Sequence, residues 1–373
     1  MSSPDLLSDL TPSHLTLNHL TLSPPSSDFQ IDFLRNLQWL LESSSYNTTY
    51  KFALIIALSN LSIESGISDQ SSLTLSYEQI AEQFIALYWR QTMPFSAEDS
   101  SSVLSQTVNK GQIKVINSIL DLQKKSSPSL LQAQKVNPKA WDTAINQVVR
   151  TLKDNPIERL QIADQKIERN FLYSFNKDLV TLKPGIAYCF SRFNQIVLKL
   201  CQQYWTDFVR KNRNNKDLFS DDIDLQEFLF DQPRQNLGAL VPILYDIQQG
   251  QCFYCHKKLK DHQEIDHFIP WSKYPIDTTH NFVLADHKCN NNKRDYLAEE
   301  KFYGQWLSRN QRYGKQITNE TKSMGFISNQ KRSETISSWA YQIAVEHKDL
   351  VWTPDSKIKL RTIDPNLLPR LRA

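Results

Sequence analysis

Most of the side chains that could perform chemistry in this sequence lie in one short segment, residues 252 to 295. The segment holds three of the five cysteines and five of the eight histidines. Asp266 and His267 are adjacent, and Asn290 follows further along the chain. A histidine side chain is mostly neutral and proton-accepting at neutral pH, which suits a general base. Carboxylate and amide oxygens suit Mg²⁺ or Mn²⁺ better than a soft metal. The two adjacent residues could therefore have separate tasks, with His267 in proton transfer and Asp266 in metal binding.

The cysteines of the same segment have the spacing of metal ligands. Cys252 and Cys255 are separated by two residues, and Cys289 follows the Asp-His pair. Four cysteines in a tetrahedral site are excluded, because the position three before Cys289 is an aspartate. We expect one structural Zn²⁺ on the three cysteines, and if none binds, hairpin packing must hold the unit together. The candidates for the fourth ligand are His287 or Asp286 and, more weakly, His256 and His262.

The order and spacing of these residues resemble those of the HNH endonucleases, the ββα-metal nucleases. The resemblance covers about residues 240 to 308 and rests on Cys252-x2-Cys255, Asp266-His267 with Pro270, Asn281, and Cys289-Asn290 with Lys293. It implies two strands, EIDHFIP and NFVLAD, followed by a helix, NNNKRDYLAEEKFYGQWLSR. Neighbouring side chains in a strand point to opposite faces, so we expect a distorted hairpin that lets Asp266 and His267 face one helix.

The resemblance also implies roles and a reaction. His267 would be the general base, Asp266 and Asn290 would hold the catalytic Mg²⁺ or Mn²⁺, and Asn281 would fix the hairpin loop and support the base. Lys293 would contact phosphate or be an ordinary helical lysine. The expected reaction is hydrolysis of double-stranded DNA to a 5′-phosphate and a 3′-hydroxyl. The alternatives are an RNA-cleaving HNH nuclease and a catalytically silent, zinc-containing module that binds nucleic acid or a partner protein.

Composition predicts that a mainly helical protein carries this segment. The chain has eight glycines in 373 residues, where average usage gives about 26. We expect a mainly α fold with a small α+β module. Its parts would be a polar leader over 1–28 that is flexible or draped over the body, a helical body over 29–240 whose first three helices would form an all-α domain, the HNH nuclease domain over 241–308, and a C-terminal extension over 309–373 with one helix. Helical spacing begins at Phe29, and Ser76 with Gln79 forms a capping-box pattern.

The helical body is larger than a cutting module needs, so we expect it to serve target recognition, regulation, or contact with a second copy or a partner protein. Its segment 208–216 carries Arg210, Lys211 and Arg213 among asparagines and is either a phosphate-contacting loop or a solvated one. Cys189 and Cys201 have apolar neighbours at helical positions and are expected to be buried small side chains.

Charge and hydropathy limit the environment of the chain. There are 43 Lys and Arg against 40 Asp and Glu, so any basic surface must be local. The longest apolar run, 52–58, is far shorter than the roughly 20 residues that cross a bilayer. The first residues lack the basic start of a secretory signal, and five cysteines do not form a disulfide framework. We therefore expect a cytoplasmic protein without membrane contact and, by analogy, a prokaryotic restriction or anti-phage defence effector.

Overall fold

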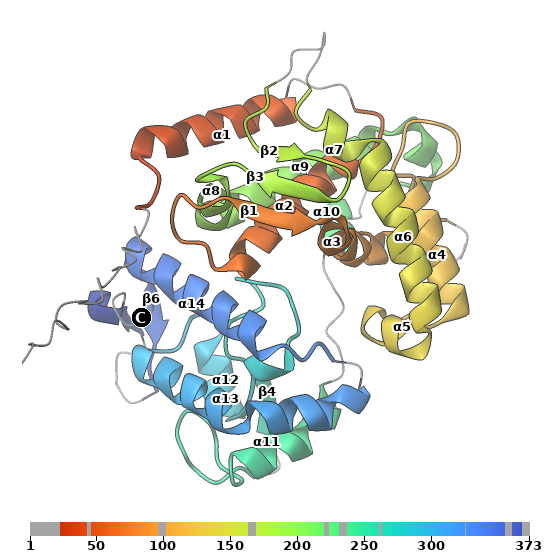
Figure 1. The fold of residues 1–373 in the computed structure, drawn as a ribbon. Helices are drawn as coiled ribbons and strands as arrows, with labels where there is room; N and C mark the ends of the chain where they lie inside the picture. The colour runs from red at the N-terminus through yellow and green to blue at the C-terminus, as the bar shows by residue number, and fades with distance from the viewer. Residues whose placement is uncertain are drawn as a thin grey trace, which may run out of the picture.

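The described residues form two hydrophobic cores. The computed structural model describes residues 23–42, 46–95, 102–162, 169–219, 224–230, 237–260, 263–324, 326–354 and 360–367. One core is built from residues between Phe33 and Leu229, and the other from Leu240 to Leu367 together with Ile63. Figure 1 shows the first group in the upper part of the molecule and the second below it. We call the first group the helical body and the second the nuclease unit, after the segment within it that resembles the HNH nucleases. Most of the expected leader, residues 1–22, lies outside the described residues.

The helical body packs around α2, in which most residues are buried. Of its 16 residues, 13 are buried, and α2 contacts α3, α8 and α9. The capping box expected at the start of α3 is present, because Ser76 and Gln79 exchange hydrogen bonds with each other's backbone N–H groups. No helix of the described residues is long and apolar enough to cross a membrane. The helices of the body are α1 (Ser27–Glu42), α2 (Tyr50–Ser65), α3 (Tyr77–Trp89), α4 (Lys114–Lys125), α5 (Leu130–Val136), α6 (Pro138–Asp154), α7 (Pro156–Arg159), α8 (Ile186–Arg192), α9 (Asn194–Lys211) and α10 (Leu225–Phe230).

The helical body is present as expected, but the expectation that its first three helices form an all-α domain is wrong, because a small antiparallel sheet includes a strand between α2 and α3. Its strands β1 (Leu73–Ser76), β2 (Tyr173–Phe175) and β3 (Leu179–Leu182) lie in the order β1-β3-β2. The turn between β2 and β3 is held by Asn176, whose side-chain oxygen accepts from the backbone N–H groups of Asp178 and Leu179. Such a local asparagine turn favours a tight hairpin over a helix. Strands this short leave little periodic pattern to find in the sequence.

The nuclease unit contains two hairpins and four helices. Its elements are α11 (Val241–Ile247), β4 (Gln263–His267), β5 (Phe282–Asp286), α12 (His287–Lys293), α13 (Glu300–Thr321), α14 (Gln330–His347), β6 (Leu350–Trp352) and β7 (Leu360–Thr362). Phe268, which follows β4, stacks on Trp306 of α13 and on Tyr341 of α14. The C-terminal segment therefore shares one core with the first hairpin. The sequence-based boundary between residues 308 and 309 falls inside α13.

The single helix expected after β5 is two helices, which corrects the sequence interpretation. Helix α12 starts at His287, where the Asp286 side chain accepts from the N–H of Lys288, and it ends at Lys293. Arg294 then adopts a positive φ of 49°, which interrupts the helix. The chain after it pairs with the C-terminal hairpin, because Leu297 accepts a backbone hydrogen bond from Trp352. This long-range pairing explains why local periodicity did not reveal the break.

A buried polar network joins the two units. Glu64 of α2 accepts hydrogen bonds from Arg332 of α14 at 2.5 Å and from the Tyr274 hydroxyl at 2.7 Å. Gln83 of α3 donates to the same carboxylate at 3.1 Å. Although burial lowers the pKa of Arg332, the charge of Glu64 raises it above its ordinary value. Tyr274 lies in the loop between β4 and β5, so the helical body directly holds a loop of the nuclease hairpin.

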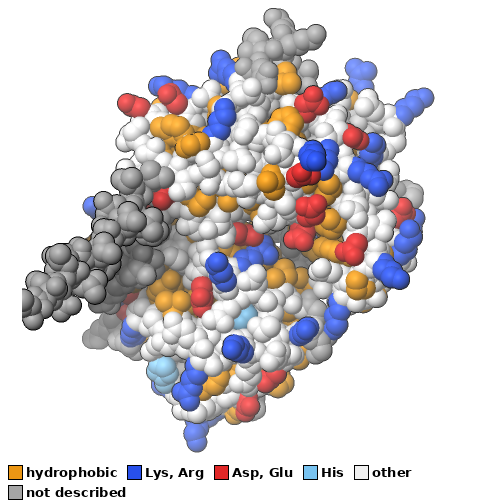
Figure 2. Space-filling model, viewed as in Figure 1, with side chains coloured by type: hydrophobic (Ala, Val, Ile, Leu, Met, Phe, Trp, Pro, Cys, Tyr) orange, Lys and Arg blue, Asp and Glu red, His pale blue; other side chains and the backbone are white. Residues whose placement is uncertain are grey.

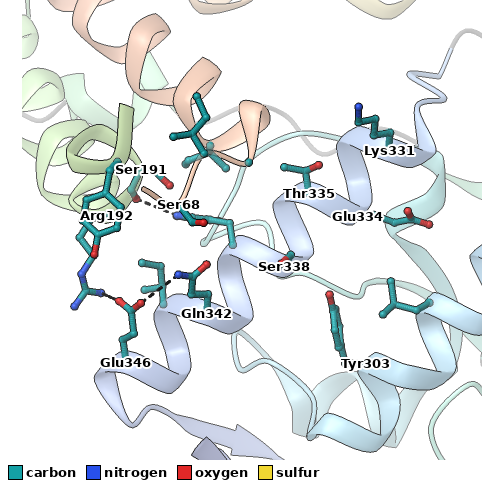
Figure 3. Close-up of a pocket in the computed structure, with 17 residues that line it drawn as sticks. Ser68, Ser191, Arg192, Tyr303, Lys331, Glu334, Thr335, Ser338, Gln342 and Glu346 are labelled. Carbon is teal, nitrogen blue, oxygen red and sulfur yellow. Dashed lines mark hydrogen bonds and ion pairs between the residues drawn. The ribbon is translucent and has the colours of Figure 1, made fainter. Parts of the chain in front are cut away.

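The interface between the units also encloses a cavity of about 380 Å³ among α2, α8, α13 and α14. Thr335, Ser338 and Gln342 line it from α14, and at one end Arg192 of α8 pairs with Glu346 at 2.7 Å (Figure 3). None of its lining residues belongs to β4, β5 or α12. The cavity is therefore a feature of the interface and not of the hairpin on which the chemistry was predicted.

Replacing Glu64 by alanine is expected to lower the free energy of unfolding by about 2 kcal/mol, because Arg332, which is only 20% exposed, and the Tyr274 hydroxyl would lose their carboxylate partner. Urea unfolding measures the difference. The matched control is Glu320→Ala, which removes an exposed glutamate of α13 and should change stability by less than about 0.5 kcal/mol. Equal stability of Glu64→Ala and the unchanged protein would contradict the importance of this network.

Candidate active site

The β4–β5 hairpin presents Asp266 and His267 on opposite faces. The two strands pair in one continuous antiparallel register, from Gln263 opposite Asp286 to His267 opposite Phe282. The expectation of a distorted hairpin is therefore wrong over these five pairs. Side-chain alternation instead places Asp266 on the face that contacts α12, whereas the ring of His267 lies against Phe282 and the β4–β5 loop.

Asp266 is almost fully buried and bound to a cation of the chain itself. Lys293 of α12, whose side chain has 0% exposure, places its Nζ 3.1 Å from the Asp266 carboxylate. The hydroxyl of Tyr254 donates to the same carboxylate at 2.5 Å, and Lys293 also donates to the carbonyl of His267 at 2.9 Å. This corrects the prediction that Lys293 contacts nucleic acid, because a fully buried ammonium group cannot reach a phosphate. Lys293 instead supplies the positive charge that a buried carboxylate requires.

Asn290 contacts a second carboxylate on the same face of β4. Its side-chain Nδ2 donates to Glu264 at 2.7 Å, and the ring of His287 lies 2.6 Å from the other Glu264 oxygen. Burial by itself would raise the pKa of Glu264, but the hydrogen bonds from Asn290 and His287 together lower it. Glu264 and Asp266 are two residues apart and share a face. Two carboxylates and the side chain of Asn290 thus lie on the face of β4 that contacts α12.

His267 is held by a carboxylate that follows it in the loop. Its Nε2 lies 2.6 Å from Oδ1 of Asp277, and the two side chains are 22% and 8% exposed. The rings of Phe282 and Trp271 lie with their centroids 4.9 Å and 5.5 Å from the imidazole centroid. The ring is thus fixed in place while about a fifth of the side chain remains exposed.

Asn281 fixes the path of the chain immediately after His267. Its side-chain oxygen accepts from the backbone N–H of Ile269 at 2.8 Å, and its nitrogen donates to the Ile269 carbonyl at 3.0 Å. On both sides of Asn281, the carbonyls of His280 and Phe282 accept hydrogen bonds from the buried side chain of Arg309 on α13. Asn281 therefore ties the end of β4 to the start of β5, which is the loop-holding geometry expected from the sequence.

The three cysteines predicted as metal ligands lie together. The sulfurs of Cys252, Cys255 and Cys289 are all within 4.8 Å of one another. In a tetrahedral zinc site with bonds of about 2.3 Å, neighbouring sulfurs lie roughly 3.8 Å apart. A side-chain hydrogen bond from Cys289 lowers the pKa of Cys252 to about 5, although burial by itself would raise it. Hydrogen bonds from backbone N–H groups, including that of Asp286, also lower this pKa. The lowered pKa favours the thiolate, which is the form that binds zinc, and the three sulfurs together fit a zinc ion.

Neither residue named as the preferred fourth zinc ligand joins this cluster. Asp286 uses its carboxylate to cap α12 and donates its backbone N–H to the sulfur of Cys252 at 3.2 Å. His287 faces Glu264 instead. Within the described part of the chain, no histidine or carboxylate lies close enough to complete a set of four. His256 is outside the cluster, and His262 lies outside the described residues.

The other predicted cysteines and cations lie in the helical body. Cys189 and Cys201 are fully buried in its core, as expected. Arg210, Lys211 and Arg213 are exposed at the end of α9. The asparagines among them hold the loop: Asn212 and Asn214 both donate to the carbonyl of Thr107, and Asn215 donates to that of Ser105. The cations are therefore presented to solvent by an ordered turn, separate in the fold from the hairpin.

Sequence reasoning missed three residues of the site. Glu264 and Asp277 were not singled out, and neither was Tyr254, which lies between the two cysteines of the first pair. Glu264 could have been found, because it stands two positions before Asp266 and strand alternation places both on one face. No local sequence pattern points to Asp277 or Tyr254, because the β4–β5 loop and the turn between the first two cysteines bring them to their partners.

An antiparallel hairpin followed by a short helix, with a histidine and hard oxygen donors at their junction, defines the ββα-metal class of nuclease modules. A family model described as HNH endonuclease matches residues 252–298 of the chain. The match confirms the resemblance and its confinement to a segment. The mainly α fold with this small α+β module is also confirmed. No curated protein matches the chain.

Purified protein is expected to contain about one equivalent of zinc by elemental analysis, because three converging cysteine sulfurs favour that ion. Cys289→Ser should reduce the zinc content to near zero and lower the melting temperature, and a chelator should lower it in the unchanged protein. Cys189→Ala, which removes a thiol from the other core, should retain the metal. Zinc below about a tenth of an equivalent in all three proteins would refute a zinc site here.

Proposed function

We propose that the chain is a divalent-metal-dependent HNH endonuclease that hydrolyses phosphodiester bonds of double-stranded DNA. The observation that carries the proposal is the end of β4, where a held histidine lies on one face of the strand, and two carboxylates and an asparagine lie on the face that contacts α12. A module that only bound nucleic acid would need neither a fixed imidazole nor hard oxygen donors next to it. The HNH match over the same residues supports a nuclease.

The donor set fits a hard cation. Asp266 and Asn290 were predicted as ligands, and Glu264 adds a second carboxylate, since its oxygen lies 2.7 Å from Asn290 Nδ2. Mg²⁺ and Mn²⁺ prefer oxygen ligands of this kind. Lys293 already neutralises Asp266, so a metal ion there would share that carboxylate with the ammonium group. When bound, the ion would supply positive charge to the phosphate and to the departing oxygen.

The protein's own residues account for the remaining steps. His267 would accept a proton from the attacking water, and Asn281 would keep the histidine's strand and loop in register. Tyr254 and Lys293 would hold Asp266 in a single orientation by their hydrogen bonds. The products expected from this in-line displacement are a 5′-phosphate and a 3′-hydroxyl.

His267→Ala is expected to lower the rate of plasmid nicking or linearisation with Mg²⁺ or Mn²⁺ by about 10²–10⁴-fold, the usual contribution of a general base. Asn290→Ala should lose activity as well, and a chelator should abolish it. His347→Ala, which changes an exposed histidine at the end of α14, is the control and should cleave normally. Equal activity of all the variants, each with unchanged circular dichroism, would contradict the assignment.

One segment of the helical body carries a local excess of basic residues, which offers a surface for DNA. Between residues 110 and 159 there are nine Lys and Arg against four Asp and Glu, whereas the whole chain has 43 against 40. Figure 2 shows Lys and Arg side chains along the edge formed by α4, α5 and α6. Lys125 and Asn137 are joined by a hydrogen bond of 3.0 Å, which brings the end of α4 to the start of α6. Residues 122–141, which form this basic corner, contain no acidic residue and four exposed lysines: Lys124, Lys125, Lys135 and Lys139.

The basic corner belongs to the end of the helical body nearer the nuclease unit (Figure 1). We therefore expect a long duplex to contact both units, with Arg210, Lys211 and Arg213 as further candidates for phosphate contact. A short duplex bound only at the hairpin would not reach the corner. This arrangement would give the body a role in substrate binding and is compatible with additional partner or regulatory contacts.

Lys124→Glu combined with Lys139→Glu is expected to weaken binding of a long duplex and to reduce the slope of log K against log salt by about 0.9 for each phosphate that is no longer neutralised. The measurement uses the His267→Ala background, so that the DNA stays intact. Lys177→Glu with Lys199→Glu makes the same charge change elsewhere on the body and should leave binding nearly unchanged. If both double substitutions weakened DNA binding equally, or if Lys124→Glu with Lys139→Glu also weakened binding of a short duplex, a local contact at the basic corner would be refuted.

RNA as the substrate is the main alternative, because the catalytic groups act on a phosphodiester in either nucleic acid. A prokaryotic restriction or anti-phage role and a cytoplasmic location remain proposals by analogy. Parallel cleavage assays on matched DNA and RNA duplexes separate the substrates. Cleavage confined to RNA would overturn the DNA proposal and leave the site assignment in place.

A further inference from the structure

The hydrogen bond between His267 and Asp277 determines which ring nitrogen can act as a base. An ionised carboxylate only accepts hydrogen bonds, so the nitrogen that faces it must carry the proton. That nitrogen is Nε2, which lies 2.6 Å from Asp277 Oδ1. In the neutral ring the lone pair is then on Nδ1, at the opposite side of the imidazole.

The position of Asp277 is itself fixed from two sides. On one side, the next residue, Thr278, accepts a hydrogen bond from Ser333 of α14 at 2.8 Å, and the Thr279 N–H donates to the Ile327 carbonyl at 3.0 Å. On the other side, Tyr274 is bound to Glu64 of the helical body at 2.7 Å. The loop that carries Asp277 is therefore clamped between α14 and the helical body, and the carboxylate is only 8% exposed.

We propose that Asp277 is the positioning residue of the catalytic histidine. It holds His267 as the Nε2–H tautomer, so that Nδ1 is the atom that receives the proton. This inference rests on the proposed nuclease function. The attacking water gives one proton to Nδ1 as its oxygen forms a bond to phosphorus. The bond from phosphorus to the 3′ oxygen breaks, and that oxygen takes a proton from solvent. Asp277 keeps its hydrogen bond to Nε2 throughout and touches neither the attacking water nor the phosphate.

The tautomer can be read directly from the ring ¹⁵N chemical shifts of His267 in metal-free protein, under conditions where the ring is neutral. The unchanged protein is expected to show protonated Nε2 and bare Nδ1, whereas Asp277→Asn should shift the population toward the Nδ1–H form. Asp295→Asn, an exposed aspartate in the turn after α12, is the control and should keep the original signals. An unchanged tautomer in Asp277→Asn would overturn the proposal.

Kinetics test the same inference independently. Asp277→Asn should lower kcat by about 10²-fold or more with KM nearly unchanged, and should cause no further loss in the His267→Ala background, because both changes disable one base. The conservative Asp277→Glu should recover part of the activity. An equal loss in the His267→Ala background would indicate a merely structural role and overturn the proposal. Since the spectra need neither metal nor substrate, they test Asp277 even if the proposed cleavage fails.

Discussion

The alternation of side chains along β4 is the constraint on which the site depends. A regular strand places residues two apart on one face, so Glu264 and Asp266 both meet α12, and His267 must point the other way. The consequence is a site in two halves. One half gathers oxygen donors around Asn290, and the other holds an imidazole against Asp277. The end of β4 is where the two halves meet, and Asn281 fixes the chain there through both of its amide atoms.

Buried charge explains why the nuclease unit cannot be reduced to its hairpin. Asp266 is buried and needs Lys293 from α12 and Tyr254 from the cysteine turn as partners. A buried carboxylate without such partners would favour its neutral form, which is a poorer donor for a metal ion. The same reasoning extends to the loop after β4, whose Tyr274 is bound by Glu64 of α2. The helical body therefore contributes to the geometry of the site, and not only to the surface around it.

The sequence predicted features that depend on local chemistry. The capping box at Ser76, the two strands of the hairpin and the convergence of three cysteines all follow from short-range patterns. The features it missed depend on distant partners. Arg294 breaks the helix because the next residues pair with the chain near Trp352, and the sheet of the body joins strands about a hundred residues apart. No periodic pattern within a single segment records such pairings.

By itself, the sequence determined which functional groups the site contains: a histidine beside an aspartate, an asparagine on the following helix, and three thiols at ligand spacing. It could not determine which of these groups meet. The tertiary structure pairs a buried Lys293 with Asp266, places His287 against Glu264, and brings Asp277 to His267. The reason is that residue type fixes what a group can donate or accept, whereas its partner depends on the packing of elements that are remote in the chain. Burial then decides which charges must be paired.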